Sequence, residues 1–251
     1  MSLSKNSLSK FRKLKKKIQY DSLEEYEEKE NSLYKKFFKK KGVGTSSDYV
    51  KIIAGKAKGI QLDVPSETKV LTSRIKTTLF DLLGPDIVGK RVLDLYAGAG
   101  SLGLESLSRG ASEATFVDPS KHAEPVLINN CKKAGFITNT TVVRDNIEDH
   151  LVIAKDEEDS YDIIFITPPY KLFNRKDLTR MTIMLNDVTK LLVGIKDEKL
   201  EGFLGAFIIV HPRKYPIEKI EIDGIIILDT YNFGVNSLTF YVVERGIKKE
   251  N

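Results

Sequence analysis

Apolar and polar positions follow two different periods along the chain from residue 48 onward. Short apolar runs rich in β-branched residues predict strands at 91–98, 113–120, 140–145, 161–169 and 205–212. Between them, apolar positions recur every three or four residues and predict helices at 101–110, 122–135, 146–155 and 177–192. Because strands and helices alternate over this length, we expect an α/β fold with one doubly wound, mostly parallel sheet.

Shorter patterns flank this alternation at both ends. DYVKIIAG and KGIQLDVP, within residues 48–65, predict an N-terminal β-hairpin, and TSRIKTTLFDLLG predicts a helix that ends at Gly84-Pro85. At the other end, GIIILDT and SLTFYVVE flank the turn-rich YNFGVN and predict an antiparallel pair at a sheet edge, which makes the sheet seven-stranded. We therefore expect an N-terminal extension, residues 1–47, and one folded domain, residues 48–251.

The charge of the chain is concentrated in this extension. Residues 1–44 contain 13 Lys and Arg against 6 Asp and Glu, a net charge of +7, whereas the remainder contains 27 against 29, a net charge of −2. A lysine-rich arm favours a polyanionic partner such as RNA, because each neutralised phosphate releases counterions. Apolar residues at helical spacing would also give it a face suited to RNA, a membrane surface or organellar targeting: Leu8, Phe11, Leu14 and Ile18. A solvated tail that only aids solubility is the alternative.

Cysteine and histidine usage excludes two classes of protein. The single cysteine, Cys131, cannot form a disulfide framework, and with three histidines in the whole chain there is no zinc-type ligand cluster. No apolar run approaches the roughly 18 residues that a membrane span requires. We expect an intracellular protein without a bound metal or a membrane span.

A glycine-rich turn follows the strand at 91–98. In DLYAGAGSLG, Gly98 and Gly100 permit a tight turn and a close approach of the backbone to a ligand, and Gly103 lets the following helix pack near the strand. Open α/β sheets bind ligands beyond the carboxyl ends of their strands, so this turn is a candidate binding site. The glycine spacing alone would fit a dinucleotide equally well.

Acids at three successive strand ends favour a ligand other than a dinucleotide. Asp94 lies inside an apolar strand end, where an unpaired carboxylate is costly, and it suits an ammonium and a sulfonium better than a pyrophosphate. Asp118 could accept hydrogen bonds from both hydroxyls of a ribose, and Asp145 one from an adenine amino group. Together the three acids outline S-adenosylmethionine, although Asp118 and Asp145 taken singly are typical helix N-caps.

The fourth strand of the alternation ends in FITPPYK, with Thr167, Pro168, Pro169 and Tyr170. With the glycine turn and the three acids in this order, the chain resembles the class I S-adenosylmethionine-dependent methyltransferases. Over about residues 51–244 it is most similar to the RsmD-type family, the guanine-N2 methyltransferases of small-subunit ribosomal RNA. The resemblance implies a Rossmann-like methyltransferase fold, with cofactor-binding residues at Asp94, Tyr96, Gly98, Gly100, Gly103, Asp118, Asp145 and Asn146.

The same resemblance implies that residues 167–170 are catalytic. An aromatic amine is a poor nucleophile, so its nitrogen must be held in line with the methyl group while its hydrogens are accepted. The family's first motif residue is Asp or Asn, and here it is Thr167, whose hydroxyl is shorter and uncharged. Ser73 and Thr77 also replace an Asp and a Glu of the family's helix motif, of which Arg74 is retained.

Five cations are candidate RNA contacts, although each taken singly is also an ordinary surface charge: Lys56, Lys58, Arg74, Arg213 and Lys214. Ribosomal RNA or the small ribosomal subunit is the expected partner of a monomer, and the basic arm could add contacts to ribosomal proteins. The cytoplasm and an organelle with bacterial-type ribosomes are both compatible locations.

Two alternative functions remain open. One is a non-catalytic RNA-binding protein of ribosome assembly, favoured by Thr167, Ser73 and Thr77. The other is a DNA adenine-N6 methyltransferase, for which no extra target-recognition region is visible.

Overall fold

The computed structural model describes residues 49–246, except 67, 69, 176–177 and 198–202. The chain divides into residues 1–48 and 49–251, and the account below concerns the second unit alone. The predicted basic extension, with its amphipathic pattern, lies outside the described residues. Within them, no helix is both long enough and apolar enough to cross a membrane.

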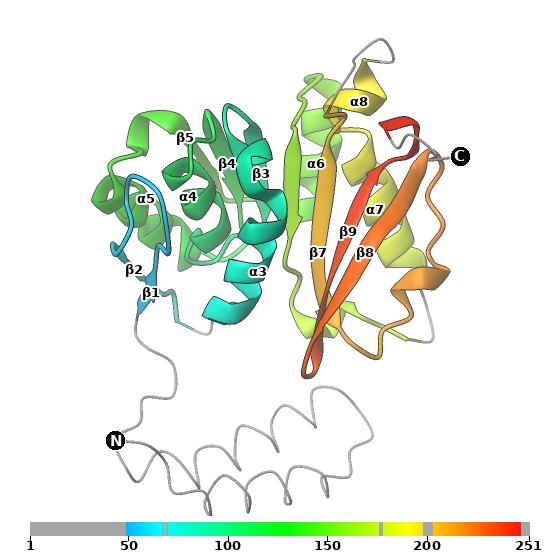
Figure 1. Ribbon diagram of the computed structural model, residues 1–251, viewed down its shortest axis with the longest axis horizontal. Helices are drawn as coiled ribbons and strands as arrows, with labels where there is room; N and C mark the ends of the chain where they lie inside the picture. Colours follow the sequence, from blue (N-terminus) through cyan, green and yellow to red (C-terminus); the bar gives the residue numbers. More distant parts are fainter. Residues whose placement is uncertain (1–48, 67, 69, 176–177, 198–202, 247–251) are drawn as a thin grey trace, which may run out of the picture. The chain divides into compact units, whose positions relative to one another are not determined.

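The described unit is built on one seven-stranded sheet (Figure 1). Its order is β5-β4-β3-β6-β7-β9-β8, with β3 to β7 parallel and β9 antiparallel to both β7 and β8. The strands are β3 (Arg91–Leu95), β4 (Glu113–Val117), β5 (Thr140–Val143), β6 (Ile163–Ile166), β7 (Ala206–Pro212), β8 (Ile225–Phe233) and β9 (Asn236–Val243). A separate hairpin pairs β1 (Tyr49–Lys51) with β2 (Gln61–Asp63).

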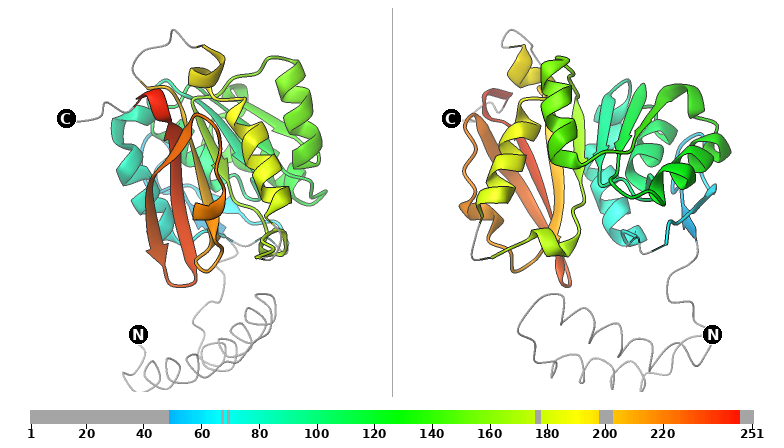
Figure 2. Two further views of the ribbon diagram at one scale, coloured as in Figure 1. Left: turned by 90° about the vertical axis from the view of Figure 1, so that its right-hand side faces the viewer. Right: turned by 180° about the vertical axis from the view of Figure 1, so that it is seen from behind.

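Helices cover both faces of the sheet (Figure 2). The face toward the viewer in Figure 1 carries α3 (Ser73–Leu83), α4 (Ser101–Ser108) and α5 (Ala123–Ala134). The opposite face carries α6 (Ile147–Asp156) and α7 (Thr179–Thr189), and the short α8 (Val193–Lys196) precedes β7. The predicted α/β class, the seven-stranded mostly parallel sheet and the N-terminal hairpin are confirmed.

Two local predictions were wrong. The segment YNFGVN was expected to be a turn, but β8 continues to Phe233 and β9 begins at Asn236, so only Gly234 and Val235 connect them. Gly234 supplies the positive φ of 65° that this tight turn needs, and the Tyr231 ring contributes to pairing by packing edge to face on Phe240 at 6.2 Å.

The helix expected over 177–192 is also shorter than predicted. It ends at Thr189, because Leu192 adopts an extended conformation and forms a bridge to Tyr161 beside the sheet. Leu191 and Leu192 are fully buried, so their packing in the core is favoured over one more turn of helix. The chain then forms α8, which the sequence pattern did not predict.

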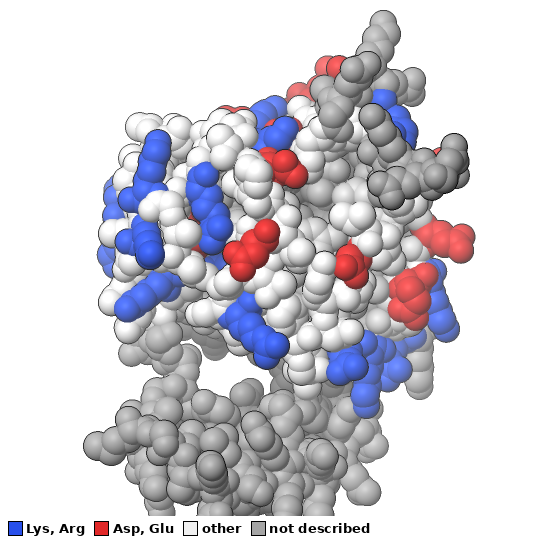
Figure 3. All heavy atoms as spheres, in the orientation of Figure 1, with Lys and Arg blue, Asp and Glu red and all other residues white. Residues whose placement is uncertain are grey.

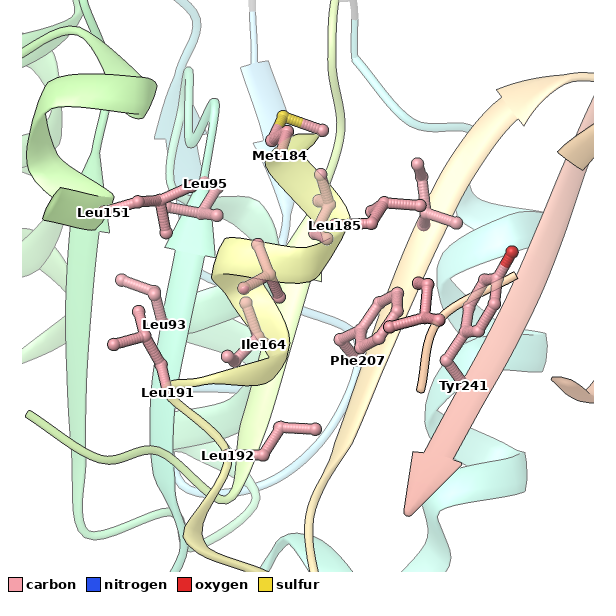
Figure 4. Packing of buried hydrophobic residues seen from close by; sticks show 14 of the residues in the cluster. Leu93, Leu95, Leu151, Ile164, Met184, Leu185, Leu191, Leu192, Phe207 and Tyr241 are labelled. Atoms are coloured by element: carbon pink, nitrogen blue, oxygen red, sulfur yellow. The ribbon is translucent and has the colours of Figure 1, made fainter. Parts of the chain in front are cut away.

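Strand residues alternate between two hydrophobic cores. On β6, Ile163 and Phe165 pack on the side of α3 to α5, whereas Ile164 and Ile166 pack on the side of α6 and α7. Figure 4 shows the second core, where Leu185 of α7 lies over Ile164 and Phe207 of neighbouring strands. Because the parallel strands are buried on both faces, their sequences read as continuous apolar runs.

A buried carboxylate attaches the N-terminal hairpin to the sheet domain. Glu105 of α4 is 0% exposed and accepts the Ile53 and Ala54 N–H groups at 2.7 and 2.9 Å. It also forms ion pairs with Lys76 of α3 at 3.2 Å and Arg109 at 3.0 Å. Burial lowers the pKa of Lys76, and Glu105 opposes this shift. One carboxylate therefore joins the hairpin, α3 and α4.

We expect Lys76→Met to lower the free energy of unfolding by about 2–4 kcal/mol, because Glu105 would lose a buried cationic partner. Arg180→Met, which removes the exposed ion pair to Glu148, should cost less than about 1 kcal/mol. Urea denaturation of the two variants beside the parent protein measures both values. Equal losses in the two variants would contradict a dominant role for the buried pair.

Candidate active site

The carboxyl ends of β3, β4, β5, β6 and β7 meet at one edge of the sheet, the lower edge in Figure 1. Strands β3 and β6 are direct neighbours, with Leu95 paired to Ile166. The glycine turn after β3 and residues 167–170 after β6 therefore lie next to each other. Asp118 follows β4 and Asp145 follows β5 at the same edge.

The turn between β3 and α4 has an unusual backbone. Tyr96, Gly98 and Gly100 have positive φ values of 61°, 55° and 73°. For tyrosine this region is rare, and such strain is found where surrounding structure requires it. The Thr68 side chain covers the turn so closely that a Cβ on Gly98 would lie 2.7 Å from Thr68 Cγ2. Nothing in the sequence pattern indicated that Thr68 would be here.

Gly103, unlike Gly98 and Gly100, has no positive φ and is required by packing alone. It lies within α4, and a Cβ at this position would be 2.3 Å from the Phe116 ring on β4. Its N–H donates to Asp94 Oδ2 at 3.0 Å. The predicted close packing of helix on strand at Gly103 is therefore present, and Asp94 fixes the first turn of α4.

Asp94 is an almost fully buried acid, 1% exposed. Burial raises the pKa of its carboxyl group from an ordinary 3.8 to about 7, while the Gly103 N–H lowers that pKa and the charge of Asp118 raises it. A cationic group placed beside Asp94 would favour its ionised form. Burial therefore disfavours the ionised form of Asp94, and a positively charged ligand would offset this cost.

Asp118 and Asp145 are half-buried, and neither is the N-cap residue of a helix. Asp118 accepts the Gly98 N–H through Oδ2 and the Ser120 N–H through Oδ1, both at 2.8 Å. Asp145 accepts the N–H of Asn146, which is the residue that caps α6. Each carboxylate oxygen can accept more than one hydrogen bond, so hydroxyl and amino donors of a ligand could still bind.

The Thr167 hydroxyl is oriented by the turn after β3. It donates to the Tyr96 carbonyl at 3.1 Å, and the Thr167 N–H donates to the Leu95 carbonyl at 3.2 Å. With its hydrogen directed at Tyr96, the hydroxyl oxygen keeps lone pairs that can accept from another group. The backbone carbonyl of Tyr96 thereby connects the two parts of the site.

The carbonyl groups of the two prolines differ in their hydrogen bonds. Pro169 O accepts the Leu172 N–H at 3.0 Å, because residues 170–172 form a 3-10 turn. No described N–H donates to Pro168 O. Among the described residues, the Pro168 carbonyl therefore accepts no backbone hydrogen bond, whereas the Pro169 carbonyl accepts one.

Tyr170 is half-buried and packs edge to face on Phe173, at a centroid distance of 6.5 Å. Phe173 in turn packs on Tyr215, which follows β7, at 5.0 Å. Phe173 and Tyr215 were not among the predicted site residues. Phe173 could have been found as the next aromatic after Tyr170, whereas only the fold brings Tyr215 near.

The structure separates the five candidate RNA-binding cations into two places. Arg213 and Lys214 follow β7 at the edge that carries the site, and the Arg74 guanidinium lies over the Phe233 ring at 5.9 Å. Lysine and arginine side chains also gather at the lower edge of the described unit in Figure 3.

Lys56 and Lys58 lie elsewhere, in the hairpin loop. The Lys56 N–H donates to the Ser108 carbonyl at the C-terminal end of α4, whereas the glycine turn precedes the N-terminal end. An eight-residue helix is about 12 Å long. The structure thus does not bring these two lysines to the candidate site.

His211 is a structural residue. Its ring is 2% exposed, and Nε2 lies 2.8 Å from the Thr239 hydroxyl on β9. Burial lowers the pKa of His211. Among the described residues, no group of three or more His, Cys, Asp or Glu side chains could hold a metal ion.

The residues at this edge fit S-adenosylmethionine chemically. Gly98 and Gly100 give the turn its positive φ values, and three acids lie at this edge: Asp94 near the end of β3, Asp118 after β4 and Asp145 after β5. A cofactor with an ammonium, a sulfonium, a ribose and an adenine presents the cationic and hydrogen-donating groups that these acids can accept.

Comparisons with known proteins agree with this arrangement. A family model described as conserved hypothetical protein 95 matches residues 50–222. Ribosomal RNA small subunit methyltransferase D of Escherichia coli strain K12 is 36% identical over 150 residues, which are 58% of this chain and 71% of that protein.

Solved structures of other proteins share this fold. The Escherichia coli protein YhhF superposes with a TM-score of 0.60 and 26% identity, over 78% of this chain and 98% of that chain. The S-adenosylmethionine-dependent methyltransferase from Agrobacterium tumefaciens shares the fold, with a TM-score of 0.57 and 15% identity over 80% of this chain and 72% of that chain.

The raised pKa of Asp94 predicts a pH dependence of stability. Because the folded-state value of about 7 exceeds the ordinary 3.8, the folded protein binds an extra proton between these pH values. This stabilisation, on the order of 4 kcal/mol, should be fully present below about pH 4 and lost as the pH rises through 7.

Asp94→Asn keeps the size of the side chain and has no proton to lose. Urea denaturation from pH 4.5 to 8, a range set by the two pKa values, should therefore show a steeper loss of stability in the parent protein than in the variant. Parallel pH profiles would contradict the raised pKa of Asp94.

Proposed function

The chain belongs to the RsmD-type methyltransferase family, described as conserved hypothetical protein 95, and from this membership we propose that it methylates the N2 of a guanine in small-subunit ribosomal RNA. It is an S-adenosylmethionine-dependent enzyme that acts on ribosomal RNA, as its relatives' names indicate. The choice of guanine N2 follows the resemblance of residues 167–170 to the family's motif.

One observation carries the proposal. The Thr167 hydroxyl donates to the Tyr96 carbonyl, so the amine-accepting motif after β6 is hydrogen-bonded to the glycine turn after β3. A methyl donor held over the turn and an amino group held by the motif would consequently be neighbours. Proximity of the two reactants supplies much of the catalysis in a direct transfer.

The proposed roles of the residues follow from their chemistry. S-adenosylmethionine supplies an electrophilic methyl group on a sulfonium. Asp94, Asp118 and Asp145 would accept its donor groups, with Tyr96 and the three glycines shaping the turn after β3 and Asn146 lying beside Asp145. The Pro168 carbonyl and the Thr167 hydroxyl would each accept one hydrogen of the guanine amino group, which turns the nitrogen lone pair toward the methyl group. The Tyr170 ring would stack on the extruded base.

Threonine can carry out the role of the family's Asp or Asn because of its hydrogen-bonding partner. A free hydroxyl rotates, whereas this one is held by the Tyr96 carbonyl with its lone pairs available. A neutral acceptor stabilises the developing positive charge on nitrogen less than a carboxylate would. We expect a slower enzyme than one with Asp, with an unchanged mechanism.

We infer that RNA reaches the site over the edge that carries Arg74, Arg213 and Lys214. Lys56 and Lys58 would contact RNA only if the substrate extends to the far end of α4, as a folded ribosomal RNA could. A ribosomal substrate implies action inside the cell, in the cytoplasm or in an organelle with bacterial-type ribosomes. Action as a monomer and contacts of residues 1–47 with ribosomal proteins remain part of the proposal.

The experiment that tests the function uses full-length protein, labelled S-adenosylmethionine and small ribosomal subunits or their RNA. We expect label in the RNA, and mass spectrometry of digested nucleosides to identify N2-methylguanosine. Label at a different base position would overturn the guanine assignment. Cofactor binding in calorimetry without any transfer would overturn the enzymatic proposal.

Variants of Thr167 test its role directly. Thr167→Val keeps the shape and removes the acceptor, so kcat should fall roughly 5- to 30-fold, as expected for the loss of one hydrogen bond at the reacting amine. Thr167→Ser keeps the hydroxyl and should remain within a few-fold of the parent. If the valine variant were as active as the serine variant, the hydroxyl would have no role in catalysis.

A further inference from the structure

The first part of each loop that follows β6 and β7 carries exposed cations and no acids, whereas Glu218, Glu221 and Asp223 come later in the second loop. Residues 167–175 contain Lys171 and Arg175, residues 211–217 contain Arg213 and Lys214, and neither segment contains Asp or Glu. All four cationic side chains are exposed. No described carboxylate forms an ion pair with Lys171, Arg175 or Arg213.

Aromatic contacts hold these two loops together. Phe173 lies between Lys171 and Arg175 in sequence, is 4% exposed, and packs on the 2% exposed ring of Tyr215 at 5.0 Å with an interplanar angle of 72°. Tyr215 directly follows Lys214. Since this contact is buried, it holds the two loops that carry the cations next to each other.

We propose that the two loops form one RNA-binding surface, in which Lys171 and Arg175 bind backbone phosphates of the nucleotides that flank the methylated base. This inference rests on the proposed function, and it adds two binding residues and the aromatic pair Phe173 and Tyr215 that positions them. Phosphate contacts fix the register of the strand, while the base itself enters beside Tyr170.

The arrangement of charge and rings favours an RNA strand over an acidic protein. The exposed Lys171 and Arg175 lie close in sequence to the half-buried ring of Tyr170, which belongs to the proposed reacting motif, whereas the Phe173 ring between them is buried against Tyr215. A base must leave its stack to be methylated, and the backbone on either side of it then needs cationic contacts.

The test compares two double variants of the full-length protein. Lys171→Gln with Arg175→Gln removes the proposed contacts. Lys155→Gln with Lys196→Gln removes two exposed cations from the last turn of α6 and from α8, which lie at the other end of the sheet. The probe is a fluorescent RNA hairpin with unpaired guanines in its loop, and its affinity is measured by anisotropy at several salt concentrations.

The first double variant should bind the hairpin more weakly, with the slope of log affinity against log salt flatter by about 1.4, or about 0.7 for each lost single-strand phosphate contact. The control should keep the parent slope. A parent-like slope in the first variant, or an equal change in both, would overturn the two-loop surface and leave the proposed function standing. Failure of the parent protein to bind or methylate small-subunit RNA would instead overturn the proposed function, and this surface with it.

The positioning role of Phe173 has its own readout. Phe173→Leu keeps an apolar side chain but loses the ring contact, so the affinity for the hairpin should fall about 2- to 12-fold with the salt slope unchanged, because no charge is removed. Phe173→Tyr keeps the ring and should restore the affinity. S-adenosylmethionine affinity, measured by calorimetry, should be the same in all three proteins. A loss of cofactor affinity parallel to the loss of RNA affinity would indicate general unfolding and overturn the positioning role.

Discussion

The parallel pairing of β3 with β6 is the constraint on which the site depends. It aligns Leu95 with Ile166, so the glycine turn and the Thr167 motif leave the sheet side by side although about 70 residues separate them. The strained Tyr96 backbone belongs to this junction, because its carbonyl receives the Thr167 hydroxyl. The proposed cofactor site and the proposed acceptor site are thereby joined by the hydrogen bond from Thr167 to Tyr96.

Two buried carboxylates hold α4 to its neighbours, Asp94 on β3 and Glu105 within the helix. Asp94 holds the first turn through the Gly103 N–H, and Glu105 holds the hairpin through two N–H groups and two cations. The two acids differ in the partners that offset the cost of burying their charge. Glu105 has cationic partners, whereas Asp94 has a single N–H and a raised pKa. An acid that lacks a full set of partners is suited to receive a charged ligand.

The replacement of the family's acidic or amide residue by Thr167 illustrates how a local departure is accommodated. Its hydroxyl lacks the reach of Asn and the charge of Asp, but the neighbouring backbone orients it. Ser73 and Thr77, the other two departures, lie on α3, which begins beside the segment that covers Gly98. Nothing in the structure explains why these two positions differ from the family's pattern.

The sequence by itself determined the order of strands and helices, the glycine turn and the place of residues 167–170 after a buried strand, because these depend on local periodicity and on backbone requirements close in sequence. It could not predict that Leu192 would leave its helix for the sheet, or that β8 and β9 would extend into YNFGVN, since long-range packing decides both.

Tertiary structure alone decided which side chains meet. It placed Lys56 and Lys58 at the far end of α4, brought Tyr215 against Phe173, and gave Thr167 its partner at Tyr96. The physical reason is that these contacts join different strands and loops. Their geometry follows from sheet order and register, which no local pattern encodes.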